Sequence, residues 1–273
     1  MKINRKRILV DVNGVRILKF NIQAPDIAQK AKAGQFVIVM VKEEGERIPL
    51  TVVDASDGEV TLIMQEIGFS TKLMGTLNEG DSLYAIVGPL GHATHIKKYG
   101  KVILVAGGVG IAEIYPVAKS LKKEGNHVTT ILGARNKDIL FFEKELKEAS
   151  DELFITTDDG SYGKKGFTTD VLKELIARGK YDLIYAVGPI PMMEKATLTT
   201  KDFGIKTMVS LNSIMIDASG MCGGCRVTVD GKSNFACVDG PEFDGHLVDW
   251  DAMKKRSKTY LEQEQHICKL NNL

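Results

Sequence analysis

The chain has 273 residues, with 36 Lys and Arg against 35 Asp and Glu, so its formal net charge is only +1. This balance provides no electrostatic field for a polyanion, which excludes a nucleic-acid or anionic-membrane binder. The length exceeds what one hydrophobic core usually organises and predicts a multidomain globular protein whose partners are small molecules or proteins.

The beginning of the chain carries no recognisable targeting signal. Its basic residues run directly into an alternating, strand-like stretch, without the apolar block and cleavage site of a secretory signal. The longest apolar runs, such as residues 102–106, fall far short of the ~20 residues that span a bilayer. We therefore expect a soluble, cytoplasmic protein.

The first third of the sequence has the pattern of an antiparallel β-barrel. Short β-rich runs recur at residues 8–12, 16–21, 35–41, 60–65 and 82–87, and glycines interrupt them. Many short strands at regular spacing, separated by turn residues, are typical of barrels.

From residue 101 the pattern changes to strands that alternate with helices. Strands are predicted at residues 101–106, 127–132, 153–156 and 182–187, and helices at 114–123 and 140–149. Such alternation predicts an α/β domain with a parallel sheet. After Gly204 the chain becomes loop-rich around its cysteines, and it ends in a polar helix predicted over residues 249–268.

Three of the four cysteines lie close together and follow an aspartate. The spacing Asp217-x4-Cys222-x2-Cys225-x11-Cys237 matches a plant-type 2Fe-2S loop in which aspartate takes the first cysteine position. Glycines in this loop allow tight backbone wrapping and expose amides to sulfur. A carboxylate is a harder ligand than a thiolate and should shift the reduction potential.

Other interpretations of the cysteines remain open. The three thiols with His246 or Asp217 also suit a structural zinc site, although the position of Asp217 is then accidental. A disulfide with one spare thiol fits a cytoplasmic protein poorly. Cys268 lies outside this set and is interpreted as a free thiol on the terminal helix.

Three loops at predicted strand ends indicate a dinucleotide site. Gly107, Gly108 and Gly110 separate a strand from a helix, where backbone N–H groups meet a pyrophosphate. Glu113 replaces the third glycine of the usual G-x-G-x-x-G, so the standard fingerprint does not match. Loops beginning at Thr157 and Gly188 should reach the same crevice, although ordinary strand-to-helix turns would look similar.

Three segments of the barrel half are candidates for a second nucleotide site. The run of residues 47–51 offers a cation, a rigid proline and a hydroxyl, suited to a diphosphate and a flat ring, although any surface loop would look alike. Residues 68–71 and 88–91 are phosphate-approach or turn sequences. His92 and His95 are interpreted as solvated loop residues.

Taken together and in order, these motifs resemble the ferredoxin-NADP reductase superfamily. The resemblance covers nearly the whole chain through R-x-P-x-T, G-P-L-G, G-G-x-G, G-P-x-x-M-M and the cysteine loop. Within the superfamily, the chain is similar to the small subunit of NADH-dependent ferredoxin:NADP oxidoreductase, a sulfide dehydrogenase subunit-like protein. That group is related to the electron-transfer subunit of dihydroorotate dehydrogenase type B, which carries cysteine where this chain has Asp217.

The resemblance implies three domains: an FAD-binding β-barrel at 1–97, an NAD(P)-binding α/β domain at 98–206 and a 2Fe-2S domain with a terminal helix at 207–273. It also implies the site residues. FAD contacts are expected from Arg47, Pro49, Leu50, Thr51, Gly68, Ser70, Thr71 and Gly88; dinucleotide contacts from Gly107, Gly108, Gly110, Asp158 and Gly188; and cluster ligation from Asp217, Cys222, Cys225 and Cys237.

Two features bear on the nucleotide. Val187 stands where many relatives have a cysteine, so no thiol contact to the nicotinamide is expected. The expectation of NAD(H) rather than NADP rests on family likeness alone. No clear acidic residue that would bind the ribose follows the second strand, and Arg135 at that place would favour the phosphate of NADP.

The resemblance implies an oxidoreductase subunit that passes electrons between NAD(H), FAD and the cluster. Because no acid, base and substrate pocket is evident elsewhere, we expect a larger flavin and iron-sulfur catalytic subunit as its heterodimer partner, with electron bifurcation as a family-level expectation. The alternatives are the dihydroorotate dehydrogenase type B subunit and a zinc-stabilised regulatory subunit that binds nucleotide without turnover.

Overall fold

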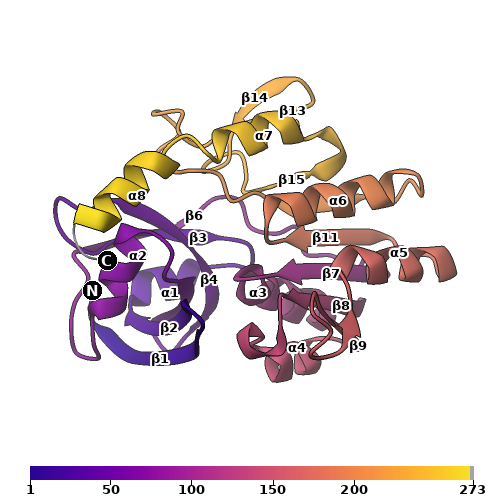
Figure 1. Ribbon diagram of the computed structural model, residues 1–273, viewed down its shortest axis with the longest axis horizontal. Coiled ribbons are helices and arrows are strands. Elements are labelled where there is room, and N and C mark those ends of the chain that lie inside the picture. Colours follow the sequence, from indigo (N-terminus) through magenta and orange to yellow (C-terminus); the bar gives the residue numbers. More distant parts are fainter. Residues whose placement is uncertain (271–273) are drawn as a thin grey trace.

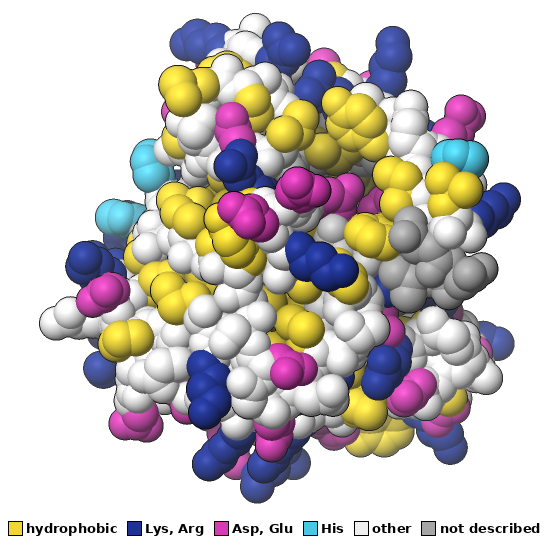
Figure 2. Space-filling view, turned by 90° about the vertical axis from the view of Figure 1, so that its left-hand side faces the viewer, with side chains coloured by type: hydrophobic (Ala, Val, Ile, Leu, Met, Phe, Trp, Pro, Cys, Tyr) yellow, Lys and Arg dark blue, Asp and Glu magenta, His cyan; other side chains and the backbone are white. Residues whose placement is uncertain are grey.

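A computed structural model describes residues 1–270, in which two large sheets lie side by side and the chain after residue 210 crosses above both (Figure 1). The N-terminal sheet and its helices form one side of the molecule, and the strand-and-helix segment forms the other. Positive, negative and hydrophobic side chains are interspersed over the N-terminal end (Figure 2). None of the described helices is long and apolar enough to cross a membrane.

The N-terminal unit is a six-stranded antiparallel sheet in the order β1-β2-β5-β4-β3-β6. Its strands are β1 (Ile3–Val12), β2 (Val15–Gln23), β3 (Phe36–Met40), β4 (Arg47–Ser56), β5 (Glu59–Gln65) and β6 (Ala85–Leu90). The tight turns Asn13-Gly14 and Asp57-Gly58 have positive φ at both residues, as the primed hairpin turns require. Backbone bonds also join the start of β1 to residues 80–83, just before β6.

Two short helices accompany this sheet, α1 (Pro25–Lys30) and α2 (Phe69–Thr76). The inward side chains of the strands form an apolar cluster that includes Leu18, Phe20 and Leu62, each fully buried. The short alternating strands of the sequence thus bury one face each, as the period of two predicts.

The second sheet has seven strands in the order β10-β9-β8-β7-β11-β12-β15. They are β7 (Lys101–Gly107), β8 (His127–Ala134), β9 (Glu152–Thr157), β10 (Lys164–Lys165), β11 (Leu183–Val187), β12 (Thr207–Ser210) and β15 (Glu242–Asp244). All pairs are parallel except that of β12 with β15. The parallel sheet predicted from the sequence is therefore present, with one antiparallel strand at its edge.

Helices connect the parallel strands and complete the layers of this unit. They are α3 (Gly110–Lys123), α4 (Glu143–Ala149), α5 (Thr168–Arg178) and α6 (Ile190–Lys201), with a 3₁₀ turn η1 (Lys137–Ile139) before α4. Helix α3 and strand β7 pack against each other in one apolar core. It includes Val102 and Leu104 of β7 and Ile114 of α3, all fully buried.

The remaining elements lie around the cysteine loop. They are the hairpin β13 (Arg226–Val229) and β14 (Lys232–Phe235), the 3₁₀ turn η2 (Gly245–Leu247), and the helices α7 (Trp250–Arg256) and α8 (Leu261–Leu270). Helix α8 extends back to the N-terminal unit and contacts α2 (Figure 1).

Several local predictions are wrong in instructive ways. The sequence pattern predicts no strand over residues 47–56, but β4 lies there, because Pro49 is tolerated within the strand and β-branched residues follow it. The turn-like sequences at 68–71 and 188–193 lead into helices α2 and α6, and residues 88–90 belong to β6. The single terminal helix is two helices, since α7 ends at Arg256.

Candidate functional site

A cavity of about 250 Å³ lies where the N-terminal sheet, the start of α3 and the segment before the cysteine loop meet. Pro49, Leu50 and Thr51 of β4 line it, as do Val109 and Glu113 beside the glycine loop. Residues 210–213 and Met215 close the third side. Three segments that are far apart in the sequence thus line one open pocket.

Strand β4 carries the predicted R-x-P-x-T residues past this cavity. Pro49 pairs with Ile38 of β3, and Leu50 and Thr51 pair with Val37 and Phe36, so the neighbouring strand fixes their position. All three cavity residues are half-buried, whereas Arg47 at the start of the strand is exposed. The strand thus presents a rigid, largely apolar wall with a cation at its end.

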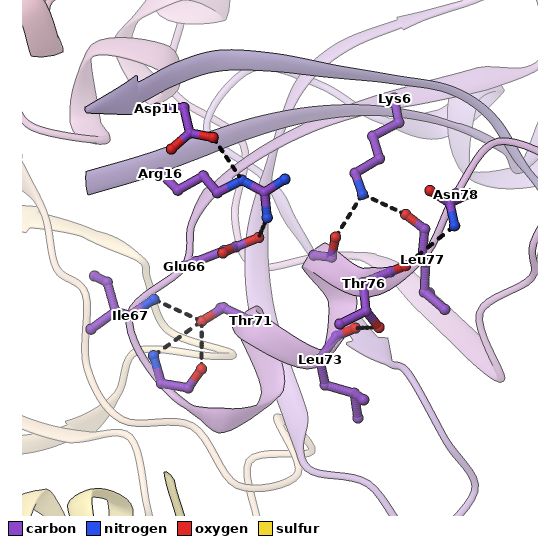
Figure 3. Close-up of polar contacts among 12 residues, drawn as sticks. Lys6, Asp11, Arg16, Glu66, Ile67, Thr71, Leu73, Thr76, Leu77 and Asn78 are labelled. Carbon is purple, nitrogen blue, oxygen red and sulfur yellow. Dashed lines mark hydrogen bonds and ion pairs between the residues drawn. The ribbon is translucent and has the colours of Figure 1, made fainter. Parts of the chain in front are cut away.

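The residues predicted to hold a diphosphate lie at the beginning of α2, but protein groups already engage them. The Thr71 Oγ1 accepts hydrogen bonds from the backbone N–H groups of Ile67 at 3.0 Å and Gly68 at 3.1 Å (Figure 3). Ser70 donates to the Glu46 carboxylate. Thr71 therefore caps the start of α2, and it also lines the cavity.

A second carboxylate also approaches this helix end. A Cβ atom at Gly68 would meet the Glu264 carboxylate of α8. Because a helix N-terminus attracts anions, the α2 start is a suitable phosphate site, but Glu264 stands at its approach and has to move for a diphosphate to bind.

The two predicted glycine loops touch each other at the carboxyl edge of the parallel sheet. A Cβ atom at Gly110 would meet the Val187 carbonyl oxygen, and one at Gly188 would meet the Gly107 carbonyl oxygen. Gly108 has φ +58°, which other residues rarely adopt. These loops follow β7 and β11, between which the strand order reverses, so they border the crevice where such sheets bind ligands.

Asp158 and Gly88 are placed differently from the glycine loops. Asp158 is exposed at the end of β9, two strands from β7 and thus roughly 10 Å along the same edge. Gly88 lies in β6, where a Cβ atom would meet the side chain of Val37. Packing against β3 is therefore the visible reason for glycine at residue 88.

The predicted cluster ligands lie in one loop and the strand end beside it. Asp217 and Cys222 belong to the loop, Cys225 stands immediately before β13, and Cys237 follows β14. The hairpin pairs Arg226 with Phe235, which brings Cys225 and Cys237 together. The structure thus gathers residues that are up to 20 positions apart in the sequence.

Polar contacts divide these four residues into two pairs. The pKa of Asp217 lies below its ordinary value because the Ser219 N–H donates to the carboxylate, and a hydrogen bond with the Cys222 thiol adds to this. Burial, followed by a hydrogen bond with Cys225, raises the pKa of Cys237 to about 12. The backbone N–H of Cys237 also donates to the Cys225 Sγ at 3.4 Å.

This donor set fits a binuclear cluster. A 2Fe-2S cluster takes two protein donors on each iron, and the loop offers one carboxylate–thiol pair and one thiol–thiol pair. Among residues 1–270, no three His, Cys, Asp or Glu groups are arranged around a single metal position. His246, the alternative zinc ligand, instead bonds the Thr200 hydroxyl through its Nε2 at 3.0 Å.

The backbone of the loop is adapted to wrap a cofactor. Gly220 and Gly223 have positive φ, as does Ala218, which is strained in that conformation. The Gly224 N–H donates to the Cys222 Sγ at 3.4 Å. From outside, the Arg256 guanidinium of α7 donates to the carbonyl oxygens of Gly223 at 3.4 Å and Gly224 at 2.9 Å.

The loop also lies close to the cavity. Met215 lines the cavity and stands two residues before Asp217, a span of at most roughly 7 Å between Cα atoms. The charge of Arg47 contributes to the lowered pKa of Asp217. The predicted flavin strand and the predicted cluster loop are therefore neighbours.

Sequence reasoning missed four residues of this region. Arg256 holds the loop, Glu46 and Glu264 approach α2, and Glu113 lines the cavity. Only Glu113 had a sequence signal, since it replaces a glycine of the fingerprint. The others lie on elements whose approach to the site depends on tertiary packing.

Comparison with known proteins agrees with this arrangement. Residues 104–197 match the oxidoreductase NAD-binding domain, and residues 212–249 match the iron-sulfur cluster binding domain of dihydroorotate dehydrogenase B. The solved ferredoxin-NADP⁺ reductase from Plasmodium falciparum, at 16% identity and a TM-score of 0.60, covers 73% of this chain and 88% of its own, and shares the fold.

Closer relatives match over most of their length. The electron transfer subunit homolog of dihydroorotate dehydrogenase B (NAD⁺) from Thermotoga maritima is 49% identical over 91% of this chain and 89% of its own. The corresponding Geobacillus thermodenitrificans subunit is 33% identical over 84% of this chain and 91% of its own. A chain of the solved NADH-dependent reduced ferredoxin-NADP oxidoreductase, with 47% identity, covers 97% of this chain and 95% of its own at a TM-score of 0.91.

The fold and site together define an oxidoreductase subunit of the ferredoxin-NADP reductase type, with an NAD-binding and an iron-sulfur-binding part. Within that class, the chain belongs to the family of dihydroorotate dehydrogenase B electron transfer subunits and their homologs.

Proposed function

We propose that this chain is the small electron-transfer subunit of an NADH-dependent ferredoxin:NADP oxidoreductase, and that it connects NAD(H), FAD and a 2Fe-2S cluster to a larger catalytic subunit. The observation that carries this proposal is the cavity shared by β4, the glycine-loop end of α3 and the segment leading into Asp217. A flat two-electron carrier held there would be reached by a dinucleotide from one side and by the cluster loop from another.

Each of the three parts of the chain is assigned one cofactor. Residues 1–97 are assigned to FAD, with Arg47, Pro49, Leu50 and Thr51 against the flavin, with Gly68, Ser70 and Thr71 at its diphosphate, and with Gly88 as a further contact. Residues 98–206 are assigned to NAD(H), which Gly107, Gly108, Gly110, Asp158 and Gly188 would border. Residues 207–273 are assigned to the cluster on Asp217, Cys222, Cys225 and Cys237, although β12 and β15 of this part complete the parallel sheet.

The chain's own groups position the reactants. When bound, FAD would link the two-electron transfer of a hydride to the one-electron transfers that an iron-sulfur cluster can accept. The rigid β4 wall orients the ring, and the paired glycine loops let the dinucleotide backbone approach closely. The lining of the cavity is mostly apolar and includes Leu50, Ile63 and Met215.

The identity of the partner follows from the cluster loop and from overall similarity. An aspartate in the first ligand position departs from the dihydroorotate dehydrogenase pattern, and the solved ferredoxin-NADP oxidoreductase chain matches almost end to end. We therefore assign the larger subunit of such an enzyme as the partner, and electron bifurcation as the activity of the pair.

An anaerobic preparation of the chain tests this function directly. Iron analysis should give two irons per chain, and the visible spectrum should contain flavin and 2Fe-2S bands that NADH bleaches. A colourless protein that contains zinc and one nucleotide would contradict the proposal and favour a regulatory subunit. Co-purification of a flavin and iron-sulfur partner from the source cells would identify the catalytic subunit.

A further inference from the structure

The mechanism proposed above leaves one carboxyl group of the cavity without a role. Glu113 lies in the first turn of α3, at the third-glycine position of the fingerprint, and lines the same cavity as Pro49 and Thr51. It is half-buried. A glutamate at a helix start usually caps or pairs, so an unengaged one inside a cavity calls for an explanation.

Glu113 has no hydrogen-bond or ion-pair partner within residues 1–270. It is also the one charged side chain among the described residues that line the cavity. Burial, as the single cause, raises the pKa of Glu113 to about 7. A carboxyl group in this condition exchanges its proton near neutral pH.

The elements packed against α3 bring other ionisable groups near the helix, but these are engaged or lie elsewhere. Asp54 of β4 pairs with Lys119 at 3.5 Å, and the Tyr185 hydroxyl of β11 donates to Glu242 at 2.6 Å. Lys101 and His127 begin β7 and β8, at the opposite end of the sheet from the glycine loop. The remaining charged residues of these elements are Arg47 on β4 and Glu143, Lys144, Glu145, Lys147 and Glu148 on α4. No charge among them contributes to the shift of Glu113.

The proposed electron transfer leaves a proton to be removed. Hydride from NADH carries two electrons and one proton, and NAD⁺ departs. A 2Fe-2S cluster held by Asp217 and the three cysteines would supply one-electron chemistry without taking up a proton, so each NADH whose two electrons left by that route would leave one proton in the cavity. A group there has to accept this proton and release it to water.

We propose that Glu113 is this proton acceptor: its carboxylate takes the proton left when electrons pass from the flavin cavity to the cluster, and the resulting carboxylic acid returns the proton to solvent. This inference rests on the proposed function and adds a residue to it. The cavity position favours this role, as do the absence of a competing partner and of a second charged lining side chain among residues 1–270.

The test compares Glu113→Gln, Glu113→Asp and the exposed control Glu148→Gln as cofactor-loaded proteins. Stopped-flow spectroscopy with NADH separates bleaching of the flavin from reduction of the cluster. In wild type and Glu148→Gln, cluster reduction should slow as the pH falls below about 7, since Glu113 is then already protonated. In Glu113→Gln, cluster reduction should be slower by a factor of roughly 10² at pH 7 and should not depend on pH in this way.

A second readout does not depend on turnover. Infrared spectra of wild type should contain a protonated-carboxyl band that titrates near pH 7 and is absent from Glu113→Gln. Glu113→Asp keeps a carboxyl group and should retain a pH-dependent rate, which separates proton transfer from a packing effect even if the glutamine variant folds poorly.

The outcomes distinguish this inference from the proposed function. If NADH does not bleach the flavin of the wild-type protein, both the role of Glu113 and the proposed function are overturned. Normal bleaching together with an unchanged pH profile in Glu113→Gln, or a wild-type infrared spectrum without the titrating band, would overturn the role of Glu113 alone.

Discussion

At the scale of single residues, the carboxylate of Asp217 distinguishes this cluster loop from an all-thiolate one. It stands beside Cys222 and Arg47, and Ser219 holds it through both its N–H and its hydroxyl at 2.9 Å. Replacing Asp217 by Ala should remove one cluster ligand and lower the iron content, whereas the flavin absorption should persist. Iron analysis and visible spectroscopy measure both. Full cluster content and an unaltered spectrum in the variant would show that Asp217 is not a ligand.

The Glu264 carboxylate at the start of α2 gives a second residue-scale prediction. It would repel a diphosphate at the helix N-terminus, so Glu264→Gln should strengthen FAD binding by about two- to fivefold, as expected for ~0.5–1 kcal/mol of charge interaction. Fluorescence titration of apoprotein with FAD measures this. Glu262→Gln on the same helix is the control, and weaker binding in Glu264→Gln would mean that Glu264 supports the nucleotide.

At the scale of elements, the sequence predicted well what local patterns control. The alternating strands, the buried run of β7 and the glycine loop after it depend on neighbours in the sequence, and their existence is confirmed. Strand β4 was missed because Pro49 argues locally against a strand, whereas pairing with β3 and β5 decides the matter.

The candidate site shows the same division. Cysteine spacing predicts the loop, because four ligands must reach two irons within a few residues. Glu46, Glu264 and Arg256 reach the site only through packing of α7, α8 and the segment before β4, which no spacing in the sequence encodes.

Helix α7 provides a prediction about one element. Arg256 donates to the carbonyl oxygens of Gly223 and Gly224, and hydrogen bonds from a charged donor contribute about 1.5–3 kcal/mol. Arg256→Met should loosen the loop and speed loss of the cluster to a chelator at least several-fold. Absorbance decay measures this rate. Lys255→Met, an exposed neighbour on α7, should behave like wild type, and equal decay in the Arg256 variant would exclude a clamping role.

At the scale of the whole molecule, one half-buried carboxyl group joins all three parts of the chain. Glu242 of β15 accepts hydrogen bonds from Tyr185 of β11 at 2.6 Å and from Thr94, in the segment between the two large sheets. Burial raises the pKa of Glu242, and the two hydrogen bonds only partly oppose this effect. The fold therefore favours the protonated form of Glu242 more than the unfolded chain does.

The sign of the resulting pH dependence follows from linkage. Because the folded-state pKa is higher than the unfolded one, the native state binds more protons, and the unfolding free energy falls as the pH rises through the raised pKa. Glu113 acts in the same direction up to about pH 7, where the cost of ionising it is about 3 kcal/mol. Both groups should make the apoprotein more stable at mildly acidic pH than above neutrality.

Denaturant unfolding of the apoprotein between pH 5 and 8 separates the two carboxyl groups. Wild type should lose stability across this range, Glu113→Gln should lose less, and the double variant Glu113→Gln/Glu242→Gln should lose less again, because a glutamine oxygen still accepts from Tyr185 and Thr94 but does not ionise. Glu148→Gln should follow wild type. If the unfolding free energy of the double variant changed with pH as much as that of wild type, the pH dependence would arise from other groups. Ionisation of Glu242 at the junction of the three parts would then cost no stability.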